Sequence, residues 1–140
     1  MDDKVKRILR ETKVIATVGF STYPHKPSHY VPAYMLRQGY RVIPVHPRAG
    51  QILGQQAYAS LDDVPEPVDL VQIFRPSHKV RPHVEQAIAI GARFVWMQAG
   101  IADPEAARLA EQAGLEVVMD RCMLVDHRQW KASGGQRAPD

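Results

Sequence analysis

The sequence predicts an α/β protein built on an open, doubly wound parallel sheet. The main observation is one joint that occurs three times: a segment with helical periodicity ends at a Gly, and a short apolar run begins three residues later. The three joints span Gly39–Val45, Gly91–Met97 and Gly114–Met119. Because Gly adopts the left-handed conformation that ends a helix without steric cost, each joint indicates helix, tight turn and strand. Helices that alternate with short strands favour a parallel sheet.

The first part of the chain predicts two helices and two strands. Val5, Ile8 and Leu9 share one face of an amphipathic segment that Asp2 or Asp3 can cap. The next apolar run ends at Gly19. The expected elements are a helix over 2–12, a strand over 14–18, a loop over 20–27, a helix over 28–38 capped by Ser28, and a strand over 41–45.

The rest of the chain predicts three more strands, which makes a five-stranded sheet with helices on both faces. Val80, Val84 and Ala87 recur at helical spacing, and Asp103-Pro104 supplies a cap followed by a first-turn proline. Trp96 lies within a strand and is expected in the core. The expected elements are a long connection over 46–60, one helical turn over 61–64, strands over 69–74, 94–97 and 117–119, and helices starting at Pro76-Ser77 and Asp103-Pro104.

Size and composition favour one cytoplasmic domain over residues 1–130, with a flexible polar tail over 131–140. No apolar run approaches the ~20 residues that span a bilayer, and the N-terminus lacks the apolar segment of a signal peptide. Cys122 is the only cysteine, so an intrachain disulfide is excluded. The net charge of +3 suits an anionic ligand but is too mild for a dedicated nucleic-acid binder.

The segments that follow the strands carry the candidate binding residues, because ligands of such sheets bind beyond the carboxyl ends of the strands. The first of these loops is the best phosphate candidate. Gly19 permits close approach to the backbone, Ser21 and Thr22 offer hydroxyls, and Lys26 adds a positive charge. The helix start near Ser28 adds free N–H groups and a positive dipole end. A tight turn without a ligand is the alternative.

A nicotinamide site fits poorly, since the G-x-G-x-x-G fingerprint is absent and no acidic residue follows the second strand. Arg48 lies there instead, which suits a nucleotide with an extra ribose phosphate, namely NADP or coenzyme A; a solvated surface charge is the alternative. Arg75 could meet a diphosphate or pair with a carboxylate. Gln98 could bind an adenine or a pantetheine amide, or cap a helix.

Cys122 could be a nucleophile only with a base within reach, and a small core residue is the commoner role for a lone Cys. The six His residues lack metal-ligand spacing, so no metal is expected. The basic N-terminal helix could instead mark a nucleic-acid or protein-interaction module, although such charges usually form a solvated face.

Five motifs occur in order between about Val14 and His127. They are V-G-x-S-x-x-P-x-x-x-S over 18–28, G-Y-x-V-I-P-V-x-P over 39–47, D-x-V-x-x-F-R over 69–75, W-x-Q-x-G-I over 96–101 and V-x-D-x-C over 118–122. With these motifs the chain resembles the CoA-binding domain family, whose Rossmann-like domain also forms the N-terminal part of the succinyl-CoA synthetase α subunit.

The resemblance implies a coenzyme A site in four parts. Gly19, Ser21 and Thr22 would form the phosphate loop; Val45, Pro47 and Arg48 would hold the adenosine and its 3′-phosphate; Phe74 and Arg75 would line the middle; Met97 and Gln98 would lie near the adenine. Two positions depart from the pattern. His46 stands where a small polar residue such as Asn is usual, and Arg121 stands where the synthetases have Asn. The synthetases also use a phosphorylated His in a later domain and a nucleotide-grasping partner subunit, so their chemistry is not expected of this chain.

We therefore expect a cytosolic protein that binds coenzyme A or an acyl-CoA at the carboxyl edge of the sheet, without catalysis of its own. The expected partner is a small nucleotide ligand, with no nucleic acid and no membrane; a protein partner stays open. The alternatives are an NADP-dependent enzyme and an accessory subunit of an acyl-CoA ligase.

Overall fold

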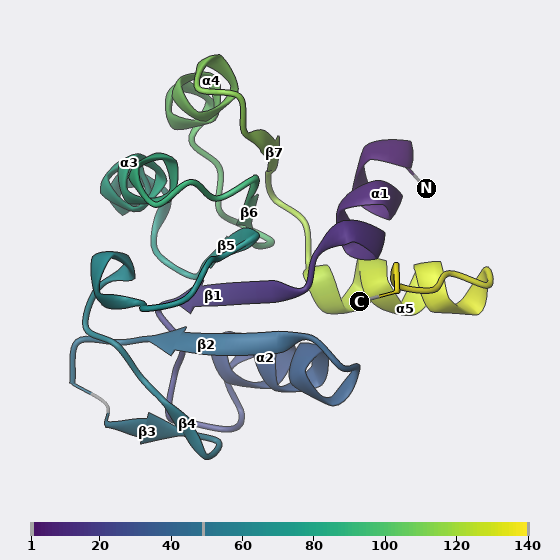
Figure 1. Cartoon of the computed structure of the whole chain (residues 1–140), viewed down its shortest axis with the longest axis horizontal. Coiled ribbons are helices and arrows are strands. Elements are labelled where there is room, and N and C mark those ends of the chain that lie inside the picture. The colour runs from purple at the N-terminus through teal and green to yellow at the C-terminus, as the bar shows by residue number, and fades with distance from the viewer. Residues whose placement is uncertain (1, 49, 140) are drawn as a thin grey trace.

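A computed structural model describes residues 2–48 and 50–139 of the chain. Five parallel strands form the main sheet in the order β2-β1-β5-β6-β7 (Figure 1). The predicted α/β fold with a five-stranded parallel sheet is confirmed. The strands are β1 (Val14–Val18), β2 (Arg41–Val45), β5 (Leu70–Ile73), β6 (Phe94–Met97) and β7 (Glu116–Val118).

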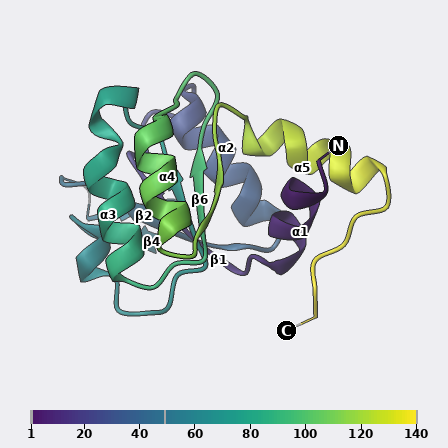
Figure 2. The ribbon, with the colours of Figure 1, turned by 90° about the horizontal axis from the view of Figure 1, so that it is seen from above.

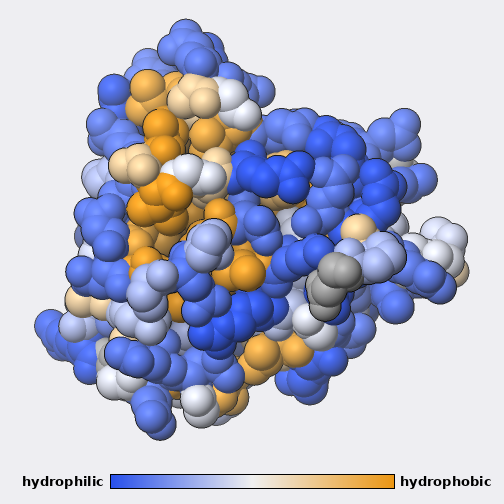
Figure 3. All heavy atoms as spheres, in the orientation of Figure 1, coloured by the Kyte–Doolittle hydropathy of each residue, from blue (hydrophilic) through white to orange (hydrophobic). Residues whose placement is uncertain are grey.

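Helices cover both faces of the sheet, as expected (Figure 2). One face carries α1 (Asp3–Glu11), α2 (Pro27–Arg37) and α5 (Met123–Ala132); the other carries α3 (Arg81–Ala89), α4 (Pro104–Gln112) and the 3₁₀ turn Leu61–Asp63. Successive strand residues enter opposite layers, because side chains alternate along a strand. Thus Ile15 packs in the α1/α2/α5 layer and Ala16 in the α3/α4 layer. In Figure 3 hydrophobic residues gather beside α3 and α4, whereas the α1 and α5 end is mostly hydrophilic.

The apolar runs that follow helix-ending Gly residues or end at a Gly predict the positions of the strands well. β1, β2 and β6 have the predicted bounds, and β5 is two residues shorter than expected. Two helix starts were wrong. α2 begins at Pro27 with Lys26 as its N-cap and without a capping side chain, so Ser28 lies inside the first turn. The segment after Pro76 forms a 3₁₀ turn (Ser77–Lys79), and α3 starts only at Arg81.

Two features were not predicted. A two-stranded hairpin, β3 (Gln51–Ile52) and β4 (Gln55–Gln56), lies within the connection from β2 to β5. α5 follows β7, and its buried residues include the polar side chains Asp126 and His127. Arg121 holds Asp126 with two hydrogen bonds of 2.7 Å each.

The ends of the described chain pack on the rest of the domain. α5 reaches Ala132, inside the segment expected to be flexible, and Asp140 lies outside the described residues. The Ala138 N–H donates to the Arg10 carbonyl at 2.9 Å, and the Arg137 guanidinium lies 5.1 Å from the centre of the Tyr40 ring. In α1, Lys4 donates to the Val117 carbonyl and Arg7 pairs with Glu116, so these cations hold the helix against β7. None of the helices in residues 2–48 and 50–139 combines the length and apolar character that a membrane crossing requires.

The strand order sets the place of the site. The chain leaves β1 for β2 on one side and then returns past β1 to β5 on the other. The connections that follow β1 and β5 therefore diverge, which opens a crevice at the carboxyl ends of these strands. A buried hydrogen-bond series fixes the central strands beneath the crevice: Thr17 Oγ1 donates to Gln72 Oε1 at 2.8 Å, and Gln72 Nε2 donates to Gln98 Oε1 at 3.2 Å.

Candidate ligand-binding site

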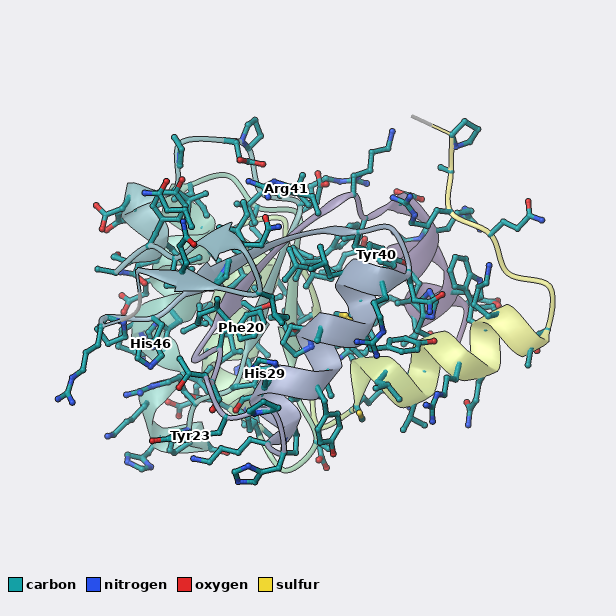
Figure 4. The ribbon with its side chains drawn as sticks, turned by 90° about the horizontal axis from the view of Figure 1, so that it is seen from below. Phe20, Tyr23, His29, Tyr40, Arg41 and His46 are labelled. Atoms are coloured by element: carbon teal, nitrogen blue, oxygen red, sulfur yellow. The ribbon has the colours of Figure 1, made fainter. Side chains whose placement is uncertain are left out.

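The carboxyl ends of β1, β2 and β5 surround a cavity of about 660 Å³, which we call the main pocket. Its volume lies in the range of small-molecule and cofactor sites. The lining consists of Val18, Gly19, Ser21, Thr22, Tyr23, Lys26, Ser28, Val45, His46, Pro47, Arg48, Ala59, Ser60, Phe74, Arg75, His83 and Gln86. Figure 4 shows Tyr23, His29 and His46 at this end of the molecule, with Tyr40 at the far end of α2.

The loop after β1 is fixed to its neighbours by backbone geometry. Gly19 has a φ of +82°, and its N–H donates to the Val45 carbonyl at 3.1 Å. A Cβ on Gly19 would lie 2.5 Å from the Phe74 carbonyl oxygen. The Gly is therefore required for the approach of this turn to the end of β5, whatever the loop binds. On the other side of the loop, His29 Nδ1 lies 2.7 Å from the Ser21 carbonyl oxygen and ties the loop to α2.

The main pocket is positively charged. Lys26, Arg48 and Arg75 line it, and its lining includes no Asp or Glu among the described residues. Within the described chain none of these three cations forms an ion pair, whereas arginines elsewhere pair with carboxylates, as Arg41 does with Glu66 and Arg93 with Glu11. The N-terminal turn of α2 has no capping side chain and faces the main pocket. Lys26 and Ser28 lie in this turn and also line the pocket. The arrangement suits a ligand with several negative charges.

Two buried polar atoms of the main-pocket lining have no hydrogen-bond partner among the described residues. They are Arg75 Nε and His83 Nδ1. Burial lowers the pKa of His83; the interaction of its side chain with Gln86 opposes this shift, and the nearby Arg75 cation adds to it. Unpaired buried polar groups are costly and uncommon, so their presence in one wall supports a binding role for that wall.

A second cavity of about 460 Å³ adjoins the main pocket, and we call it the side pocket. The two share Lys26, Ser28, Phe74 and Arg75. The other residues that line the side pocket are Pro27, Tyr30, Pro76, Gln98, Ala99, Ile101 and Cys122. The segments after all five strands of the main sheet thus contribute to the two cavities, as the strand order predicts.

Residues 13–128 match the family described as the CoA binding domain. The chain belongs to this family. Within residues 2–48 and 50–139 no three His, Cys, Asp or Glu side chains come together in a way that could hold a metal ion.

Three relatives illustrate the range of proteins to which this chain is similar. The uncharacterized protein YneT of Bacillus subtilis is 36% identical over 89% of this chain and 92% of its own length. A hypothetical protein from Pyrococcus horikoshii is 37% identical, with a TM-score of 0.88 over 92% of this chain and 91% of that one. The acetate–CoA ligase (ADP-forming) I of Archaeoglobus fulgidus is 31% identical over 79% of this chain, which corresponds to 18% of that ligase.

The structure brings together most of the residues that the sequence singled out for this family's ligand. Gly19, Ser21, Thr22, Lys26, Val45, Pro47, Arg48, Phe74 and Arg75 all line the main pocket. Gln98 lies in the side pocket, and its Oε1 accepts hydrogen bonds from Gln72 Nε2 and from the Met123 N–H at 3.1 Å. Met97 is fully buried in the core and lines neither pocket.

Several lining residues escaped sequence reasoning. Ser60 follows the hairpin, and His83 and Gln86 lie on α3, one turn apart. Gln86 Nε2 donates to Ser60 Oγ at 3.1 Å. None of the three follows a strand directly. For His83 and Gln86 the available signal was a polar side chain on a helix whose buried residues are Val84 and Ala87.

Proposed function

We propose that the protein binds coenzyme A, free or acylated, in the main pocket as a cytosolic protein without catalysis of its own. The observation that carries this proposal is the gathering of Lys26, Arg48 and Arg75, without ion-pair partners among the described residues, in a pocket at the switch point of the sheet. Coenzyme A carries a ribose 3′-phosphate and a diphosphate, so its charges match three separate cations. Membership of the CoA binding domain family supports the same ligand.

The order of the cations suggests the direction of the ligand. Arg48 follows β2 at one end of the main pocket and would bind the 3′-phosphate. Lys26 and Arg75 follow β1 and β5 and would bind the diphosphate beside the N-terminus of α2. The adenosine would lie between Pro47 and the wall that contains Ser60 and His83. The pantetheine arm would then leave toward β6, where the side pocket begins.

We expect coenzyme A to stabilise the protein in thermal unfolding, and 3′-dephospho-CoA to do so much less. A ligand at 100 times its Kd raises the free energy of unfolding by ~2.7 kcal/mol, which is a clear shift in Tm. NADP and NAD are measured in parallel. A shift with NADP alone would contradict the proposal and point to an oxidoreductase.

The Arg48→Glu variant should bind coenzyme A about tenfold more weakly, because a carboxylate would face the 3′-phosphate. Its affinity for 3′-dephospho-CoA should change little, which assigns the loss to that phosphate. Arg108→Glu, an exposed α4 substitution outside both pockets, makes the same change in net charge and is the control. Equal losses in both variants would show that only overall charge matters.

A further inference from the structure

The side pocket lies where the reactive end of the proposed ligand would arrive. The sheet order runs from β2 through β1 and β5 to β6, and the two pockets follow the same order along the carboxyl edge. Phe74 and Arg75 at the end of β5 belong to both cavities. A molecule with its 3′-phosphate at Arg48 and its diphosphate at Arg75 therefore continues into the side pocket without turning back.

The far wall of the side pocket is apolar. Beyond the residues shared with the main pocket it is formed by Pro27, Tyr30, Pro76, Ala99 and Ile101, with Gln98, Cys122 and the Tyr30 hydroxyl as the polar groups. The two cations of this cavity, Lys26 and Arg75, lie at the shared wall, on the side where the diphosphate would bind. A free thiol would leave most of this apolar surface facing water, which is unfavourable.

One polar group is positioned to receive a carbonyl. Gln98 is 3% exposed, and its Oε1 accepts two hydrogen bonds within the protein, from Gln72 and from Met123. Two donors on one oxygen fix the orientation of the amide, so the Nε2 group is the donor that Gln98 can offer to the pocket. A thioester or pantetheine carbonyl is an acceptor of the matching kind.

From this geometry we infer that the preferred ligand is an acyl-CoA with a short apolar acyl group, and that the side pocket holds the acyl group. This inference rests on the proposed function, since the main pocket must hold the nucleotide part. The volume of 460 Å³ has to contain the end of the pantetheine arm as well, which limits the acyl group to a few carbons. A charged acyl group would lose its hydration against the apolar far wall without gaining a partner there.

Isothermal titration of the full chain with CoA, acetyl-CoA, butyryl-CoA, succinyl-CoA and palmitoyl-CoA tests the inference. Butyryl-CoA has two methylenes more than acetyl-CoA and should bind about tenfold more tightly, because each buried methylene contributes up to about fourfold. Succinyl-CoA has the same chain length but ends in a carboxylate, and it should bind more weakly than butyryl-CoA. Palmitoyl-CoA is too long for the pocket and should gain nothing over butyryl-CoA.

A matched pair of variants tests whether the preference for butyryl-CoA arises in the side pocket. Ala99 is exposed and lines only the side pocket, whereas Ala102 is exposed and lines neither pocket. Ala99→Trp should abolish the preference for butyryl-CoA over acetyl-CoA. Ala102→Trp should retain the preference. Cys122 supplies a local readout, because butyryl-CoA should slow its alkylation by iodoacetamide more than acetyl-CoA at equal occupancy.

The possible failures are distinct. If CoA binds but butyryl-CoA binds no tighter than acetyl-CoA, or if succinyl-CoA binds best, the acyl assignment is overturned and the proposed function stands. If the preference survives in Ala99→Trp, the acyl group lies elsewhere. If neither CoA nor any acyl-CoA binds, the proposed function falls and the inference falls with it.

Discussion

Replacing Gly19 by Ala should lower the free energy of unfolding by about 3 kcal/mol. Two costs add at this position. A residue with a side chain at a φ of +82° costs roughly 1–2 kcal/mol, and a Cβ 2.5 Å from the Phe74 carbonyl oxygen forces a backbone shift of the kind that costs roughly 1–3 kcal/mol. The displaced atom belongs to the backbone at the end of β5, so it cannot simply rotate away. Urea unfolding, followed by circular dichroism, measures the loss.

Gly91→Ala is the matched control. Gly91 has a φ of +78°, and a Cβ there would meet nothing within 4 Å, so this variant carries the conformational cost alone. The difference between the two variants isolates the contact with Phe74. If both lose the same amount, the tight approach of the loop to β5 does not contribute. The size of the expected effect also makes Gly19 a poor position for testing ligand binding, because a bulky residue there damages the fold before it meets a ligand.

Acidification from pH 7 to pH 4 should remove about 3 kcal/mol of stability through His127 alone. Burial, with smaller contributions from the nearby Lys131 and Arg137 cations, lowers the pKa of this imidazole from its ordinary value of 6.5 to about 4. Below pH 6.5 the unfolded chain therefore takes up a proton that the folded protein excludes. The stabilisation is present above pH 6.5, is lost progressively as the pH falls through 4, and levels off only well below the folded pKa, where both states are protonated.

The surroundings of His127 explain why it stays neutral. Its ring is 2% exposed and lies edge-on to the rings of Tyr34, Tyr40 and Trp130, and its Nδ1 is 2.8 Å from the Tyr34 hydroxyl oxygen. The unprotonated Nδ1 of a neutral imidazole accepts a hydrogen bond from that hydroxyl, whereas in a protonated ring both nitrogens are donors. Denaturant unfolding at several pH values measures the dependence.

His127→Gln is the test variant and His25→Gln, which changes an exposed histidine, is the control. His127→Gln should be less stable at pH 7 but should lose less on acidification. The control should keep the dependence of the parent protein. A parent-like slope between pH 6.5 and 4 in His127→Gln would assign the acid sensitivity to other groups.

The pattern of residues along short stretches of the chain was sufficient to predict the strands of the sheet. A Gly that ends a helix and the β-branched run that follows it are recognised from a few neighbouring residues. The predicted bounds of β1, β2 and β6 are accordingly correct. α5 could not be recognised in the same way. Its buried face includes Asp126 and His127, which look like surface residues until Arg121 and Tyr34 are placed beside them. Their burial depends on partners that the pattern along the helix does not contain.

The same distinction holds for the site. The loops after β1, β2 and β5 were predicted to meet because carboxyl ends of parallel strands lie at one edge, and they do line a single pocket. Ser60, His83 and Gln86 complete that pocket from the hairpin connection and from α3. Their position depends on how these elements pack over the sheet, which no local pattern specifies. Met97 was expected near the ligand from its place at the end of a strand, yet strand alternation turns it into the α3/α4 layer.

The contact between the C-terminal segment and the start of the sheet bears on how this domain can be joined to others. Ala138 pairs with Arg10, and Lys13 Nζ donates to the Pro139 carbonyl at 3.1 Å, so the segment ends beside the amino end of β1. Both pockets open at the opposite, carboxyl edge. A fluorescent protein or an enzyme fused after this segment would sit away from the ligand entrance. The domain is thus suited to modular assembly, with its linkage point and its binding face on opposite sides.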